Sequence, residues 1–288
     1  GKDFFRGDTK IAMKNLPTEL VQKIKAYDKK SDYAEQTGVD DGEEETVIDL
    51  SLKEKLKESW VSNLDAGAGT KHRYSGNLFV NRFTDYDRET FFGNANNTGD
   101  RGFRWGRGAG NGLVASKSAG VNLGWSNRKK EREQGFFEIS GNVRWNHNGS
   151  DQQSRSSSET FLNSGSSSSF SNSKSNNYSH STNINSGIRL KWNPDTLTTI
   201  TFRPSFSYSE SDSWSQSRTA TFNDDPYSIA GVSDPLGAIF QDSIAALRGI
   251  TVNTNHRRSM GDSKSTSFNG WGMIVRRLNN EGRNASLS

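Results

Sequence analysis

The sequence predicts a mainly β fold: an incomplete segment of an antiparallel transmembrane β-barrel, preceded by a small α+β piece. The first observation behind this prediction is a stretch from Phe137 to Trp145 in which apolar or small residues alternate with polar ones. Successive side chains of a strand point to opposite faces, so this strand has one apolar face and one polar face. Tilted by about 40°, it rises roughly 20 Å, close to the apolar band of an outer-membrane barrel.

The second observation is the composition. Only 30% of the 288 residues are hydrophobic, yet the chain holds 7 Trp, 7 Tyr and 16 Phe. A soluble domain is usually about 45% apolar with glycine counted, and a disordered chain is poor in aromatic residues. A barrel with a wet lumen accounts for both facts, because only one face of each strand has to be apolar.

The third observation is that short and long connections alternate. Short turns are expected at 84–89, 127–134, 193–196 and 279–282, and long stretches at 98–117, 149–182 and 210–265. Outer-membrane barrels combine short periplasmic turns with longer outer loops, whereas a soluble sandwich has no reason for this asymmetry. The Ser- and Asn-rich stretch 149–182 is predicted to be a mobile loop, and 210–265 a loop with a small helix near Ile239–Leu247.

The chain divides into three parts in order. Residues 1–52 form the α+β piece: Leu16, Leu20, Val21 and Ile24 have helical spacing, and Val47–Leu52 is read as a strand. Residues 53–58 are a charged linker. Residues 59–288 hold nine expected strands of about ten residues each. These strands are marked by Trp60–Ala68, Tyr74–Val80, Phe91–Asn97, Ala119–Trp125, Phe137–Trp145, Ile184–Trp192, Ile200–Tyr208, Trp271–Val275 and Arg283–Ser288.

The alternation also assigns side chains to the two faces of the expected sheet. Lipid is expected to contact Phe137, Ile139, Val143, Trp145, Ile188, Leu190, Trp192, Ile200 and Phe202. The lumen is expected to be lined by Asp65, Glu138, Asn142, Arg144, Arg189 and Arg203. Asp65 and Glu138 are read as lumen lining rather than as an acid/base pair, because nothing in the sequence places them together.

No motif indicates catalysis, a metal or a cofactor. The stretch Gly106–Gly112 lacks the Gly-Lys-Ser/Thr ending of a phosphate loop and is read as a flexible outer loop rather than an RNA-binding segment. Asp40-Asp41-Gly42 does not match a calcium-binding EF-hand loop. The four histidines are expected at loops or strand ends without metal-ligand spacing: His72, His147, His180 and His256. The absence of cysteine excludes disulfides and thiolate chemistry.

The distribution of charge does not indicate a nucleic-acid partner. The 37 basic and 33 acidic residues are interspersed and give a net charge of +4. This mixture favours solvated loops and a polar lumen over a nucleic-acid surface. We therefore expect no enzyme, no cofactor and no nucleic-acid partner. No run of about 18 apolar residues occurs, so no transmembrane helix is expected.

Several segments resemble the TonB-dependent receptors and related outer-membrane β-barrel proteins. The segment IAMKNLPTELVQKIKAYDKKSDYAEQTGVDDGEEETVIDLSL, residues 11–52, is similar to the end of their plug domain. AGAGTKHRYSGNLFVNRF (66–83) and FFGNANNTGDRGF (91–103) look like their first barrel strands. NTNHRRS (253–259) and RRLNNEGRNASLS (276–288) are similar to their recurring strand-turn segments.

The resemblance implies a plug inside a barrel of about 22 strands in the outer membrane of a Gram-negative cell. It also implies an unknown extracellular ligand and an energising TonB-type complex in the inner membrane. The energy-coupling box and most of the plug are then expected before Gly1, and more than half of the barrel after Ser288. The 288 residues alone are accordingly expected to aggregate or fail to insert.

Two other functions remain open. One is a non-transporting outer-membrane barrel for adhesion or surface scaffolding, which an energy-coupling box upstream of Gly1 would disfavour. The other is a soluble, secreted β-rich protein, which would partition into water without detergent.

Overall fold

A single antiparallel sheet dominates the computed structural model, which describes residues 21–52, 58–84, 86–99, 113–127, 129–130, 133–161, 168–241, 243–278 and 284–288. The nine strands of the sheet are β3 (Ser59–Gly69), β4 (Arg73–Phe83), β5 (Asp87–Asn96), β6 (Leu113–Ser126), β7 (Phe136–Phe161), β8 (Ser168–Asn193), β9 (Thr198–Phe222), β10 (Thr251–Arg277) and β11 (Asn284–Leu287). Each overlaps one of the nine predicted strands, so the prediction of a mainly β antiparallel fold is confirmed.

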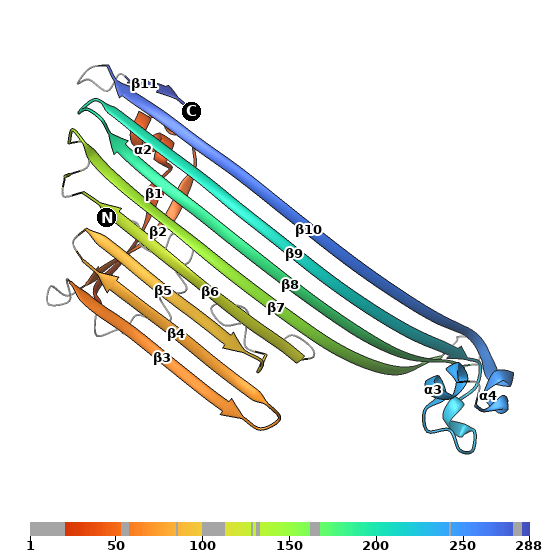
Figure 1. Ribbon diagram of the computed structural model, residues 1–288. Coiled ribbons are helices and arrows are strands. Elements are labelled where there is room, and N and C mark those ends of the chain that lie inside the picture. Colours follow the sequence, from red (N-terminus) through yellow and green to blue (C-terminus); the bar gives the residue numbers. More distant parts are fainter. Residues whose placement is uncertain are drawn as a thin grey trace.

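The strands follow one another in the sheet in the order in which they occur in the chain (Figure 1). Strand β3 lies at one edge and β11 at the other, and no ladder among the described residues joins these two edges. The sheet is therefore open rather than closed into a barrel.

Four strands are far longer than predicted. Strands β7 to β10 contain 25 to 27 residues each, and they extend well beyond the other strands (Figure 1). The prediction of a mobile loop at 149–182 is wrong, because most of this stretch belongs to β7 and β8. Hydroxyl and amide side chains bond across the strands there: the Oγ atoms of Ser154 and Ser175 lie 2.7 Å apart. Ser157 Oγ donates to Asn172 Oδ1 at 2.6 Å.

The predicted long loop at 210–265 is also shorter in the structure, because β9 extends to Phe222 and β10 begins at Thr251. The connection between them is residues 223–250. This connection holds η3 (Pro226–Ser228), α3 (Pro235–Phe240) and α4 (Ala245–Ile250), so two short helices stand where one was predicted. They pack on the far end of β8 and β9 through a cluster of buried side chains, Ala220, Phe222, Leu236 and Leu247. We call residues 223–250 the cap.

A small unit of β1 (Val21–Lys30), α2 (Asp32–Thr37) and β2 (Glu44–Leu52) precedes the sheet, and we call it the N-terminal unit. Strands β1 and β2 pair as an antiparallel hairpin. The prediction of a helix from Leu16 to Ile24 is wrong for the residues that the structure describes, because Val21 and Ile24 belong to β1. Leu16 and Leu20 lie outside the described residues. The predicted strand Val47–Leu52 is confirmed as part of β2.

Helix α2 has clear end signals. The hydroxyl of Ser31 accepts a hydrogen bond from the Ala34 N–H at 3.0 Å, which caps the first turn. Gly38 follows the last residue with φ 75°, the left-handed conformation that ends many helices.

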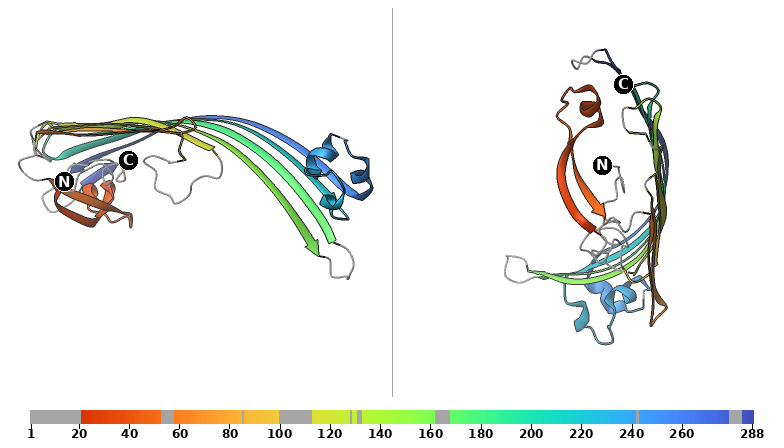
Figure 2. Two further views of the ribbon diagram at one scale, coloured as in Figure 1. Left: turned by 90° about the horizontal axis from the view of Figure 1, so that it is seen from below. Right: turned by 90° about the vertical axis from the view of Figure 1, so that its left-hand side faces the viewer.

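Figure 2 shows that the long sheet is curved and that the N-terminal unit lies on its concave side.

The turn between β8 and β9, residues 194–197, is organised by one carboxylate. Asp195 Oδ1 accepts hydrogen bonds from the N–H groups of Leu197 and Thr198 at 2.7 and 2.8 Å. Asp195 Oδ2 accepts one from Thr198 Oγ1 at 2.9 Å. These bonds favour the charged carboxylate, and the one from the Leu197 N–H contributes most to lowering the pKa of Asp195 below its usual 3.8.

This turn is expected to resist mild acid. A carboxyl with a lowered folded-state pKa contributes stability above its unfolded pKa, and the contribution is lost as pH falls through the folded value. Relative to the intrinsic exchange rate at each pH, exchange of the Leu197 amide is therefore expected to accelerate only below pH 3.8. Asp195→Ala is expected to accelerate it at neutral pH as well, whereas Asp195→Asn, which keeps an acceptor oxygen, changes it less. Equal acceleration in both variants would contradict this role of the acceptor.

Candidate functional site

The ladder register divides the sheet into two faces with opposite character. Residues paired across an antiparallel ladder share a face. Ile139 pairs with Trp125 and Leu190, and Leu190 pairs with Phe202. We call this face A. It contains all nine residues for which lipid contact was predicted: Phe137, Ile139, Val143, Trp145, Ile188, Leu190, Trp192, Ile200 and Phe202.

Face A exposes a large area of apolar side chains. Leu64, Leu123 and Phe202 are 76%, 50% and 48% exposed, although they lie on three different strands. Monomeric soluble proteins rarely expose contiguous apolar patches of more than a few hundred Å². We call the region of face A between the rows of Phe137 and Trp145 the apolar band. Contact of this band with lipid stays a prediction.

Aromatic residues lie at both ends of the apolar band. Phe137 pairs with Trp192, and the ring of Phe137 lies 6.0 Å from that of Trp125. At the other end, Trp145 and Tyr208 share one row through Ile184. The two rows are eight residues apart along β7, as the alternation in the sequence predicted.

The opposite face, face B, is mainly polar within the same region, although it also carries the buried pair Phe79 and Phe92. Asn142 pairs with Asn122, and Arg144 pairs with Gly120. The register places all six predicted lumen residues on this face: Asp65, Glu138, Asn142, Arg144, Arg189 and Arg203. The structure does not bring Asp65 and Glu138 together, since they lie on strands β3 and β7. Whether this face lines a lumen remains a prediction.

One predicted strand carries its apolar side chains on face B instead of face A. Trp271 pairs with Arg203, and Met273 pairs with Thr201. Met273 and Val275 are 1% and 3% exposed, while Ile274 of the same strand belongs to face A. The apolar residues that marked this strand therefore pack inside the concave face rather than in the apolar band.

The N-terminal unit is attached to face B by charged and polar contacts. The Asp32 carboxylate accepts a hydrogen bond from Arg189 Nη2 at 3.0 Å, and it also contacts the guanidinium of Arg203. The side chains of Asp32 and Arg189 are each only 8% exposed. Gln36 Nε2 donates to Thr201 Oγ1 at 3.0 Å, and Asn284 donates to the Thr37 carbonyl. Helix α2 thus contacts strands β8, β9 and β11.

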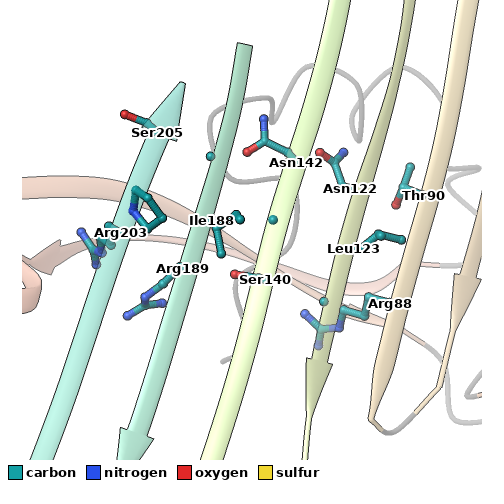
Figure 3. A pocket seen from close by; sticks show the side chains of 14 residues that line it. Arg88, Thr90, Asn122, Leu123, Ser140, Asn142, Ile188, Arg189, Arg203 and Ser205 are labelled. Atoms are coloured by element: carbon teal, nitrogen blue, oxygen red, sulfur yellow. The ribbon is translucent and has the colours of Figure 1, made fainter. Parts of the chain in front are cut away.

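A pocket of about 280 Å³ lies in the sheet next to these contacts. Side chains from five strands, β5 to β9, line it (Figure 3). The described lining residues include three arginines, Arg88, Arg189 and Arg203, and no acidic side chain. Amide and hydroxyl groups of Thr90, Asn122, Ser140, Asn142 and Ser205 complete the polar lining. We call this pocket the arginine trough.

Two rows of the register explain the shape of the trough. In the first row Arg88 pairs with Gly124, Gly124 with Ser140, and Ser140 with Arg189. The small residues in the middle leave a depression between arginines on β5 and β8. In the second row Asn142 pairs with Asn122 and with Gly187.

Pro204 interrupts the ladder beside the trough. Pairs between β8 and β9 stop at Gly187–Ser205 and resume at Leu190–Phe202. Proline has no N–H to donate, and within a sheet it is usually confined to edges and bulges. Its presence inside a central strand fits a site where regular pairing gives way to a pocket.

The four histidines noted in the sequence do not form a metal site among the described residues. His147 and His180 lie inside β7 and β8 rather than at strand ends, and their rings stack 5.6 Å apart. His256 lies inside β10, while His72 is in the turn after β3. Within the described ranges, no three His, Asp or Glu side chains converge as metal ligands would. Gly106–Gly112 lies outside the described residues.

The acidic turn at residues 40–42 is tied to the N-terminal unit. Lys30 Nζ donates to Asp40 Oδ2 at 2.7 Å, and this hydrogen bond lowers the pKa of Asp40 and raises that of Lys30. Asp41 accepts a hydrogen bond from Ser31, which lowers the pKa of Asp41. These carboxylates therefore close the loop between α2 and β2.

Two charged residues of the site were not predicted. Asp32 gave no signal, because its partner Arg189 is 157 residues away in the chain. Arg88 precedes the weakest predicted strand, and its place in the trough follows only from the register of β5 on β6.

Comparison of the chain with protein-family models, with curated proteins and with solved structures finds no match. Among the described residues, no helix is long and apolar enough to cross a membrane.

Proposed function

We propose that the chain belongs to an outer-membrane receptor of the TonB-dependent type, which takes up an extracellular ligand through a plugged β-barrel. The observation that carries the proposal is the two-faced sheet, with an apolar band edged by aromatic residues on face A and polar side chains on face B. Transmembrane barrels have this arrangement, with aromatic girdles at the two interfaces and a polar interior. Lipid would cover face A, and face B would line the lumen.

The N-terminal unit supports the plug in this proposal. It lies on the concave side of the sheet and is held there by Asp32, Gln36 and Thr37. A unit in that position would obstruct a lumen formed around face B. Energy from a TonB-type complex in the inner membrane would then shift the unit and admit the ligand.

One observation favours a second function. Strands β7 to β10 continue beyond the row of Trp145 for about 14 or more residues, which is roughly 45 Å at 3.3 Å per residue. We call this part, residues 146–161, 168–183, 209–222 and 251–265, the distal extension. It would project from the cell surface, where an adhesive or scaffolding protein acts. A non-transporting barrel would retain this extension and would need no energising partner.

The membrane position of the apolar band can be measured with tryptophan fluorescence. Trp125 and Trp192 are expected at the periplasmic interface, because their strands enter the short turns, and Trp145 at the outer interface. Single-tryptophan variants in outer-membrane vesicles would be quenched by lipids carrying the quencher in one leaflet only. Trp125 and Trp192 should respond to the inner leaflet and Trp145 to the outer one. Quenching of Trp145 and Trp192 from the same leaflet would overturn the proposed orientation.

A further inference from the structure

The arginine trough and the N-terminal unit share two side chains. Arg189 and Arg203 line the trough, and both also contact the Asp32 carboxylate of α2. Arginine presents a planar fork of donors that fits a carboxylate or phosphate group. The carboxylate of Asp32 therefore already shows, within the chain, what kind of group these two arginines bind.

We infer that the arginine trough binds a solute bearing a carboxylate or phosphate group, and that this solute competes with Asp32 for Arg189 and Arg203. Arg88 on the opposite wall and the amides of Asn122 and Asn142 supply further donors to an occupant. The volume of about 280 Å³ admits a small polyanion. This inference deepens the proposed function and rests on it only for the role in uptake, not for the binding.

Competition couples the ligand to the position of the N-terminal unit. When two groups exclude each other from one site, each weakens the binding of the other by the same factor. An anion in the trough would therefore loosen the docking of α2 on face B. Conversely, removal of the Asp32 charge would remove this competitor for the two arginines and raise the affinity of the anion.

The test uses the longer protein that the proposed function implies, with these 288 residues inside it, in detergent. Citrate and inorganic phosphate are the probes, and sodium chloride at matched ionic strength is the reference. These 288 residues contain no cysteine, so spin labels can be placed at Val39→Cys and Leu197→Cys, which are 55% and 41% exposed, once any cysteine elsewhere in the longer protein is replaced by serine. Their separation reports whether the N-terminal unit is docked. Titration calorimetry gives the affinity, and the citrate and phosphate arms distinguish a carboxylate ligand from a phosphate ligand.

Asp32→Asn is expected to raise the affinity for the tighter-binding probe by about fivefold or more, the low end of common coupling factors. It should also broaden the distribution of label distances. Asp28→Asn is the matched control: it removes the same charge from the same unit, where Asp28 accepts a hydrogen bond from Thr46 rather than from the sheet. This control should leave affinity and distances unchanged. In the unmodified chain, the probe itself should broaden the distances.

Arg88→Gln tests the trough while keeping Arg189 and Arg203, the two arginines that contact Asp32. It should weaken probe binding and leave the label distances unchanged in the absence of the probe. Binding no tighter than that of chloride, or binding unaffected by Arg88→Gln, would overturn the anion site. Binding that is equal in Asp32→Asn and the parent would overturn the competition. Failure of the tryptophan quenching experiment would instead remove the membrane receptor and leave these binding results intact.

Discussion

Replacing Ile139 by arginine is expected to impair insertion of the protein into the outer membrane far more than replacing Asn142 by arginine. Ile139 lies on face A and is 37% exposed, and Asn142 lies on face B among polar side chains. The two residues are three positions apart on β7, so the two variants place the same charge on opposite faces of one band, with Asn142 the nearer to its middle.

The expected difference follows from the cost of a charge in lipid. An arginine on the lipid face of a barrel costs about 2–4 kcal/mol at the midplane and less toward the interfaces. An arginine at Asn142 would meet polar neighbours such as Asn122 and would avoid most of this cost. The quantity to measure is the fraction of protein in the outer-membrane pellet after a carbonate wash, against total protein in the cell. Equal losses for both variants would contradict the assignment of the faces.

Phe222→Ala is expected to detach the cap from the sheet. The side chain of Phe222 is 0% exposed and packs in the cluster with Ala220, Leu236 and Leu247. Truncation of a buried phenylalanine typically costs about 3–5 kcal/mol, because it removes apolar contacts and leaves a cavity. The cap consists of a 3-10 turn and two helices of six residues, and Phe222 is the largest side chain among the four buried residues of the cluster that joins it to the sheet.

Hydrogen exchange resolved by peptide would show this loss directly. Amides of residues 235–250 should exchange faster in Phe222→Ala, by a factor that reports the lost free energy, while those of the N-terminal unit keep their rates. Phe161→Ala is a suitable control, because Phe161 also lies in a long strand but is 78% exposed. A cap that keeps its protection in Phe222→Ala would show that other contacts hold it, such as the ion pair between Arg155 and Asp234.

Alternation of apolar and polar residues was sufficient to locate the nine strands and to assign the faces of the apolar band, but not to predict the full lengths of β7 to β10. From Phe137 to Trp145 the pattern is local, and a one-residue slip would move every side chain to the other face. The register agrees with the alternation on each strand except β10. There, Trp271, Met273 and Val275 alternate just as well but lie on face B. The local pattern does not show that α2 docks on this face, where Gln36 bonds Thr201, the ladder partner of Met273.

The distal extension was missed because its sequence has no apolar face. Ser- and Asn-rich segments bury little apolar surface, so their composition resembles that of a disordered loop. In the structure they pair in register with neighbouring strands and bond through side chains such as Ser156 and Ser173. The pairing of β7 with β8 is continuous from the apolar band outward, so the ladder carries the strand conformation into the polar sequence.

In the N-terminal unit, the sequence pattern predicted the wrong type of element and could not predict the contacts with the sheet. Val21 and Ile24 are three residues apart, a spacing that suits one helix face, and it led to the wrong element. The contact between Asp32 and Arg189 joins two parts of the chain that no local pattern links. The arginine trough likewise assembles from five strands, so only the register brings Arg88 opposite Arg189.

The strand order has a consequence for how the chain folds. Every ladder in the nine-stranded sheet joins strands that are consecutive in the sequence. Hairpins with short connections form in about 1–10 μs, and folding is fastest when contacts are local. The β8–β9 hairpin is closed by residues 194–197, so we expect it to nucleate folding. Neighbouring strands would then add to its two sides, and each addition would require the closure of only one connection.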